Sequence, residues 1–146
     1  MNIPADVQIK ATIKPGSVFY FVEEALSSDD PHYFIVLNHH PLTDDILVLV
    51  CSSSQISKVK ARVKRRNFPQ STVVELLKSE YPDFTKDSIV DCNEVFPRTI
   101  AQLVEKLRHG ELRLKTIMES GLVDKLRQAV LDSPKVKNDQ IKNCLR

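Results

Sequence analysis

The sequence predicts an α+β domain in which several short strands form a small open barrel and a helical C-terminal third packs against it. Two observations lead to this class. Residues 15–92 carry short apolar segments rich in Val, Ile, Phe and Tyr, separated by clusters of Pro, Ser, Asp and Asn, a pattern typical of strands in a small sheet. After residue 99 the apolar residues change to a helical period, and strands followed by helices indicate an α+β domain.

Length and composition fit one folded domain. The chain has 146 residues, of which 42% are hydrophobic and 27% charged, so it belongs with globular rather than disordered or fibrous proteins. We expect a single domain over residues 1–146, with the barrel at about 14–97, C-terminal helices at about 99–133 and a polar tail at 134–146. The last dozen residues are polar, and we expect them to be frayed.

Several classes of protein are excluded by simple patterns. The longest apolar run, residues 46–51, is far shorter than the roughly 20 residues that cross a bilayer, and residues 1–12 lack the apolar segment of a secretory signal. The three cysteines are unevenly spaced and form no Cys-x-x-Cys pair, which fits reduced thiols and offers no zinc template. We therefore expect a cytoplasmic protein with no membrane contact, no cofactor and no metal site.

The barrel strands are delimited by turn residues. Pro15 and Gly16 form a turn before the first strand, because Pro fixes its own backbone angle and Gly accepts a positive one. Polar segments at 29–31 and 41–45 separate the next strands. The candidate strands are residues 18–22, 33–37, 46–51, 72–76 and 88–92.

A basic segment at residues 57–66 alternates cations with apolar residues, which predicts a further strand with its cations on one face. Lys and Arg outnumber acids only by 21 to 19, so a nucleic-acid partner has to be argued from the position of the charges. These cations can follow a phosphate backbone, or they can form a solvated edge strand that lysines protect from aggregation. The cations of this strand are Lys58, Lys60, Arg62 and Lys64, followed by Arg65 and Arg66.

The C-terminal third has helical spacing. Thr99 and Gln102 form a capping box, and Gly110 marks the end of the first helix. Residues 114–118 predict a second short helix and residues 122–130 a third. The residues that follow the i, i+3, i+4, i+7 rule in the first helix are Ile100, Leu103, Val104 and Leu107.

The order of these motifs resembles the MazF/PemK/Kid family of bacterial growth-inhibiting toxins. The resemblance covers about residues 14–131. It implies an SH3-like barrel with C-terminal helices and a toxin of a toxin–antitoxin system. Such a toxin is a homodimer that cuts single-stranded RNA without a metal and is neutralised by an antitoxin protein. The matching segments are 15–21 (Pro-Gly-Ser-Val-Phe-Tyr-Phe), 35–38 (Ile-Val-Leu-Asn), the polar 52–58, 86–90 and 97–100 (Pro-Arg-Thr-Ile).

The resemblance also implies a set of site residues. In family members that cut RNA, the ribose 2′-hydroxyl attacks the adjacent phosphate, so the protein must supply an acid, a base and positive charge. His32 stands where the family has its catalytic Arg, Ser53 replaces the usual Thr of the polar turn, and Arg98 belongs to the Arg-Thr pair after the last strand. We expect these three as catalytic residues. The expected nucleic-acid contacts are Ser54, Lys58, Lys60, Arg62, Lys64 and Asn93.

Each candidate has a simpler structural alternative. Imidazole serves as acid or base near neutral pH, but His32 also fits a solvated loop residue after Pro31. His39 and His40 are adjacent, so on an extended chain they point to opposite faces and suit a solvated loop better than a metal site. His109 suits the C-terminus of a helix, where a cation complements the helix dipole. Cys51 and Cys92 lie in apolar strands and fit small core residues.

Two other function classes stay open. One is a catalytically silent barrel that acts by binding a protein, as the related gyrase-poisoning toxins do, and the other is a nucleic-acid-binding module without cleavage. One barrel can serve all three functions, so the fold alone does not separate them. The discriminating feature is whether His32, Ser53 and the basic segment converge on one concave surface.

Overall fold

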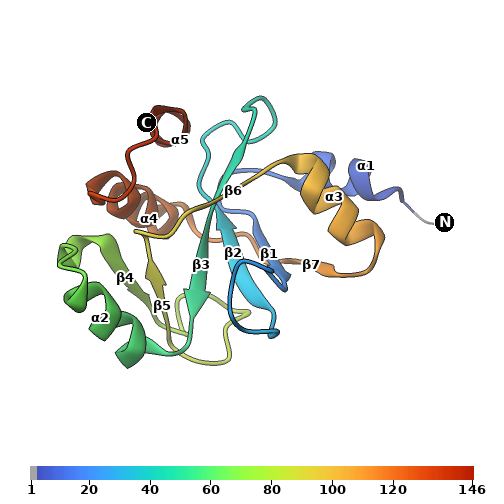
Figure 1. Cartoon of the computed structure of the whole chain (residues 1–146). Helices are drawn as coiled ribbons and strands as arrows, with labels where there is room; N and C mark the ends of the chain where they lie inside the picture. The colour runs from blue at the N-terminus through green and yellow to red at the C-terminus, as the bar shows by residue number, and fades with distance from the viewer. Residues whose placement is uncertain (1–2) are drawn as a thin grey trace.

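The structure is a computed structural model that describes residues 3–146, and its elements are labelled in Figure 1. The strands are β1 (Val18–Phe21), β2 (His32–Val36), β3 (Leu47–Ser53), β4 (Val73–Leu76), β5 (Ser88–Asp91), β6 (Phe96–Arg98) and β7 (Leu112–Lys115). The helices are α1 (Ala5–Thr12), α2 (Ile56–Arg65), α3 (Ile100–Arg108), α4 (Ser120–Asp132) and α5 (Asp139–Leu145), with a 3₁₀ turn η1 (Gln70–Thr72) before β4.

The seven strands form one antiparallel sheet, in which six follow the order β4-β5-β3-β2-β1-β7 and β6 pairs with β3 beside this path. The long strand β3 pairs with β2 along one side and with two strands along the other, β6 at residues 47–49 and β5 at residues 52–53. Within the described residues β4 and β7 are the two ends of the sheet, which is therefore not closed. The predicted α+β class is confirmed.

Five of the six predicted strands are present, those at 18–22, 33–37, 46–51, 72–76 and 88–92, with boundaries that differ by one or two residues. The turn at Pro15 and Gly16 is also confirmed, and Gly16 has a φ of +85°. A Cβ atom at Gly16 would lie 2.8 Å from the backbone oxygen of Met118, so glycine serves both the backbone angle and the close approach of the segment after β7.

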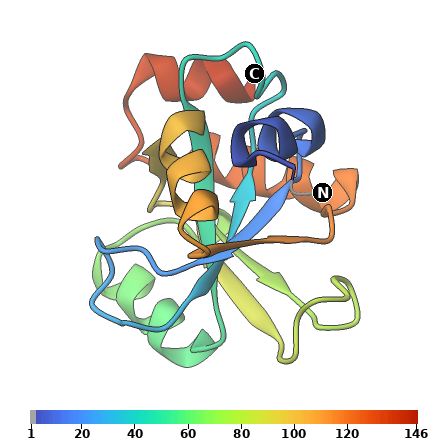
Figure 2. The same cartoon turned by 90° about the vertical axis from the view of Figure 1, so that its right-hand side faces the viewer.

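Helices cover both faces of the sheet, and each face has its own core. Neighbouring strand residues point to opposite faces, so Val18 and Phe19 enter different clusters. In one, α4 packs on Val18, Ile35, Val48 and Val50 through Leu122, Leu126 and Val130. In the other, α1 and α3 pack on Phe19, Phe21, Phe34 and Leu49 through Ile9 and Leu103. Figure 2 shows α1 and α3 together at the front of the molecule.

The strand predicted at residues 57–66 is wrong, because this segment forms helix α2. Its apolar residues alternate, but Ile56, Val59 and Val63 also fit a helical spacing, and Lys and Arg are good helix formers. Val59 and Val63 are buried against Ile89 of β5, forming a small third cluster. The segment therefore follows the helical period, which buries Val59 and Val63 on one face, rather than the alternating period of a strand.

The C-terminal third corrects two further predictions. The capping box at Thr99 and Gln102 is confirmed at the start of α3, and the helix predicted at 122–130 is confirmed as α4. The helix predicted at residues 114–118 is wrong, because residues 112–115 form strand β7, which pairs with β1, and residues 116–118 form no regular element. The tail is not frayed: α5 buries Ile141 and Leu145. None of the helices described over residues 3–146 has the length and apolar character needed to cross a membrane.

Candidate functional site

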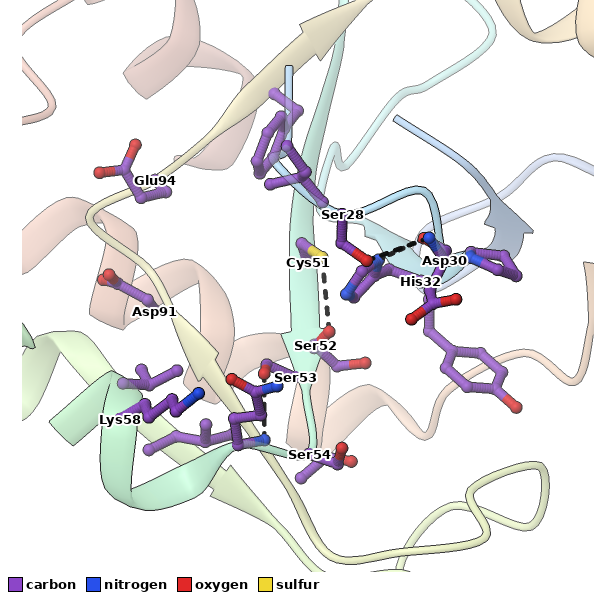
Figure 3. Close-up of a pocket in the computed structure, with 18 of the residues that line it drawn as sticks. Ser28, Asp30, His32, Cys51, Ser52, Ser53, Ser54, Lys58, Asp91 and Glu94 are labelled. Atoms are coloured by element: carbon purple, nitrogen blue, oxygen red, sulfur yellow. Dashed lines mark hydrogen bonds between the residues drawn. The ribbon is translucent and has the colours of Figure 1, made fainter. Parts of the chain in front are cut away.

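A cavity of about 960 Å³ opens where the start of β2, the end of β3, helix α2 and strand β6 meet (Figure 3). Its walls come from segments far apart in the sequence: the loop 25–31, the turn between β3 and α2, the segment 84–89 and the connection from β5 to β6. The volume is at the upper end of the range of ligand sites, roughly 300–1,000 Å³.

Six of the nine side chains expected at a site line this cavity, and three do not. All three expected catalytic residues are among the six, together with two cations of α2. The lining residues are His32, Ser53, Ser54, Lys58, Arg62 and Arg98. The three outside are Lys60, Lys64 and Asn93.

His32 is the first residue of β2 and is half-buried, with its ring turned into the cavity (Figure 3). Its Nδ1 lies 2.9 Å from the backbone oxygen of Asp30. A carbonyl oxygen only accepts hydrogen bonds, so Nδ1 carries the proton in the neutral ring and Nε2 keeps its lone pair. Nε2 is thereby prepared to take a proton from a ligand.

The turn from β3 into α2 supplies hydroxyl groups at the cavity. Ser53 Oγ accepts a hydrogen bond of 3.1 Å from the backbone N–H of Gln55, so its own O–H stays available to donate. Ser54 and Gln55 also line the cavity at the start of α2. The N-terminal end of a helix carries partial positive charge and free N–H groups, and both favour an anion.

Helix α2 presents two different basic faces. Its cavity face carries Lys58 and Arg62, one turn apart, and Arg66 follows just after the helix on the same side. Its outer face carries Lys60, which pairs with Glu75 of β4 at 2.9 Å, and the exposed Lys64. The single basic face expected from a strand is therefore divided in two.

Three cavity cations have carboxylate partners. Arg62 Nη2 lies 3.0 Å from Asp91, Arg66 Nη1 lies 3.2 Å from Glu94, and Arg98 Nη2 lies 2.7 Å from Glu23. The other two lining cations, Lys58 and Lys86, form no ion pair with any residue of the described range 3–146. These two lysines therefore carry the positive charge of the cavity that no ion pair neutralises, and the lining carboxylate of Asp30 likewise has no ion pair within residues 3–146.

Glu23 is a site residue that the sequence analysis missed. Its side chain is buried behind Arg98 and accepts hydrogen bonds from Arg98 Nε at 2.9 Å and from the backbone N–H of Ala25 at 3.0 Å. Burial opposes ionisation of Glu23, but the Ala25 N–H and the Arg98 charge outweigh it, so the pKa of Glu23 lies below its ordinary value. Glu23 thus fixes the guanidinium of Arg98.

Asn93 does not contact the cavity. It is 2% exposed, and its Nδ2 donates to Asp91 Oδ1 at 2.9 Å and to Thr72 Oγ1 at 2.8 Å. Its Oδ1 accepts a hydrogen bond of 2.6 Å from Ser133 Oγ. Asn93 was expected to contact nucleic acid directly, but both polar atoms of its buried side chain are hydrogen-bonded to other residues of the protein.

Cys51 lies on the cavity wall, and burial raises the pKa of its thiol to about 12, with Glu23 adding to the rise and Arg62 opposing it. The thiol therefore stays protonated at neutral pH and is a weak nucleophile. Burial also raises the pKa of Cys92 in the core. Cys92 fits the core role expected of it, whereas the half-buried Cys51 packs against the core and also lines the cavity.

Comparison with known proteins finds no family model and no curated protein that matches this chain.

The residues described, 3–146, hold no cluster of three or more His, Cys, Asp or Glu side chains with the geometry of a metal site. His39, expected in a solvated loop, directs Nε2 to the backbone oxygen of Leu145 in α5 at 3.1 Å.

Proposed function

We propose that this protein is an endoribonuclease that cuts single-stranded RNA in the cavity without a metal ion. The observation that carries the proposal is the convergence of His32, Ser53, Arg98 and the cavity face of α2 on one concave surface. These groups supply a proton acceptor, a hydroxyl donor and positive charge, which are what cleavage by the neighbouring 2′-hydroxyl requires.

The reaction needs two proton transfers. His32 Nε2 accepts the proton of the 2′-hydroxyl while a bond forms between O2′ and phosphorus. The bond between phosphorus and the 5′-oxygen then breaks, and the protonated imidazole returns its proton to that oxygen. The products are a 2′,3′-cyclic phosphate and a 5′-hydroxyl end.

The phosphate develops additional negative charge during this step. The Ser53 hydroxyl, Lys58 and the N-terminal turn of α2 are placed to stabilise it, because all three border the same cavity. Arg98 contributes a guanidinium whose orientation is fixed by Glu23. A group held in place before the reaction stabilises the transition state without the cost of reorganisation.

The wider proposal is a cytoplasmic MazF/PemK-like toxin with an SH3-like barrel, neutralised by an antitoxin protein and acting as a homodimer. The sheet edges support pairing with a second chain, since Leu77 follows β4 and Leu114 lies on β7, and both are exposed. Sedimentation at micromolar concentration should give the mass of a dimer. A monomer alone would contradict this part of the proposal.

The alternative is a module that binds without cutting, and one observation favours it. Arg62, Arg66 and Arg98 each have a carboxylate partner, which reduces the positive charge offered to a phosphate. A cavity with both charges suits a protein partner that also carries both charges, and this would make the chain a catalytically silent barrel that binds a protein.

Incubation of long single-stranded RNA with the protein in EDTA separates these functions. We expect cleavage by the wild type and by His109→Ala, which removes an exposed imidazole that pairs with Glu105 at the C-terminal end of α3, and loss of cleavage in His32→Ala. Intact RNA at high protein concentration would overturn the proposal and favour binding without cleavage.

A further inference from the structure

A buried polar cluster stands directly behind Arg62 of the cavity. Asp91, the last residue of β5, is 7% exposed and accepts a hydrogen bond of 3.0 Å from Arg62 Nη2 through Oδ2. Its other oxygen, Oδ1, accepts two hydrogen bonds from Asn93, one from the backbone N–H at 3.0 Å and one from Nδ2 at 2.9 Å. Asn93 therefore fixes the carboxylate that fixes Arg62.

Asn93 is itself held from two distant parts of the chain. Thr72 of η1 accepts from its Nδ2, and Ser133, just after α4, donates to its Oδ1. Buried hydrogen bonds of this kind keep a side chain in one conformation, since a lost partner leaves a buried polar group unsatisfied. The orientation of Asp91 is thus set by the fold rather than by the solvent.

Arg62 is incompletely satisfied in this arrangement. Its Nε is buried and has no hydrogen-bond partner among the described residues, whereas Nη2 is held by Asp91. The guanidinium still reaches the cavity, because Arg62 is one of its lining residues. A planar guanidinium held on one edge keeps further N–H groups in a fixed orientation for a phosphate oxygen.

We propose that Asn93, acting through Asp91, is the positioning residue that holds Arg62 toward the phosphate of a bound single strand. This inference rests on the proposed function for its ligand but not for its geometry. Without the Nδ2 donor of Asn93, Asp91 Oδ1 keeps only the hydrogen bond from the backbone N–H of residue 93, so the carboxylate turns more easily and Arg62 regains the rotamers of a long side chain. Ordering them again on binding costs affinity.

Salt dependence of binding tests this inference, because a phosphate contact contributes about 0.7 to the slope of log K against log salt for a single strand. A 2′-O-methyl oligonucleotide, which has no 2′-hydroxyl to attack, serves as the probe. The variants are Arg62→Ala, Asn93→Ala and the two combined. Ser133→Ala is the matched control, because it removes a hydrogen bond from Asn93 but leaves both donors to Asp91 in place.

We expect Asn93→Ala and Arg62→Ala each to lower the slope by about 0.7, and the double variant to lower it no further. Ser133→Ala should keep the wild-type slope. A wild-type slope in Asn93→Ala, with a reduced slope in Arg62→Ala, would overturn the inference. If Asn93→Ala does not fold, Asp91→Asn takes its place, since it removes the charge that holds Arg62, and the same two outcomes decide.

Nuclear magnetic resonance separates failure of this inference from failure of the proposed function. The Arg62 Nε–H is buried, so it should give a distinct side-chain signal that is absent from Arg62→Ala. We expect that signal to merge with those of solvated arginines in Asn93→Ala and to persist in Ser133→Ala. Absence of oligonucleotide binding by the wild type would sink the RNA function alone, whereas an unchanged Arg62 signal in Asn93→Ala would sink the positioning role.

Discussion

The two faces of helix α2 carry the same charge in different surroundings. Lys58 and Arg62 line a cavity together with His32, whereas Lys60 pairs with Glu75 outside it and Lys64 is exposed. The difference arises from the period of the helix, which brings residues four apart to one face and sends residues two apart to the other. Cation content alone therefore does not identify a binding surface.

The cavity face also differs from the outer face in its neighbours. It borders the Ser53 hydroxyl at the end of β3 and the His32 imidazole at the start of β2, whereas on the outer face Lys60 pairs with Glu75 of the edge strand β4. If the cavity is the site, changes on its side should alter function, and matched changes on the outer side should alter only local stability.

The largest effect is expected from His32. His32→Ala should lower the single-turnover rate of RNA cleavage by roughly 100-fold or more and leave binding largely intact, because a general acid or base acts in the transition state. His109→Ala measures the effect of removing an imidazole elsewhere. Equal rates for His32→Ala and the wild type would place the chemistry at another residue.

Replacement of His32 by arginine sharpens this result. Guanidinium stays protonated and cannot exchange a proton, so His32→Arg should also be slow. Cleavage by His32→Arg at or above the wild-type rate would show that positive charge, rather than proton transfer, is the contribution of this position.

Charge reversal compares the two faces directly. Lys58→Glu with Arg62→Glu should weaken binding of the 2′-O-methyl oligonucleotide by about 10-fold or more, since contacts with charged groups are worth about 1.5–3 kcal/mol each. Lys60→Glu with Lys64→Glu makes the same change in net charge, and it should have a much smaller effect, because salt screens the outer face. Similar losses for both pairs, measured by fluorescence anisotropy at one salt concentration, would contradict a functional difference between the two faces.

The ion pair between Arg98 and Glu23 should make the free energy of unfolding depend on pH. Glu23→Gln should lower the free energy of unfolding by about 1.5–3 kcal/mol at pH 7. Because the pKa of Glu23 is lowered by folding, its contribution is present above the unfolded pKa and is lost as pH falls through the folded one. Urea unfolding at pH 7 and near pH 3 should show the difference between Glu23→Gln and wild type shrinking in acid, and a constant difference would contradict this account.

The smallest effect belongs to the outer face. Lys60→Ala breaks the ion pair with Glu75, in which both side chains are about half exposed, so the free energy of unfolding should fall by at most about 1 kcal/mol. Cleavage by Lys60→Ala should match the wild type. A large loss of activity at wild-type stability would assign Lys60 to the site and remove the distinction between the faces.

Elements with a clear local signal were predictable from the sequence. The five strands have turn residues at their ends, and α3 has a capping box at Thr99. Residues 57–66 fit two periods, and only the burial of Val59 and Val63 against β5 selects the helix. Strand β7 and helix α5 depend on distant partners, namely the edge of β1 and the core, and short polar segments do not encode such partners.

The candidate site was predictable to a similar extent. The residues named by the family resemblance, His32, Ser53 and Arg98, do line one cavity. The carboxylates that hold its arginines, Glu23 and Asp91, were missed, because their roles come from contacts between segments 29 to 75 residues apart. An acidic residue next to an apolar strand can indicate a buried ion pair, but the sequence does not show which Arg or Lys is its partner.

Analysis of the cleavage products tests the central claim most directly. RNA cut by the purified protein in EDTA should carry 2′,3′-cyclic phosphate and 5′-hydroxyl ends, because the neighbouring 2′-hydroxyl is the attacking group. The same ends should be scarce with His32→Ala and abundant with His109→Ala. Products with 3′-hydroxyl and 5′-phosphate ends, or no products at all, would contradict the proposal that this cavity cuts RNA through His32.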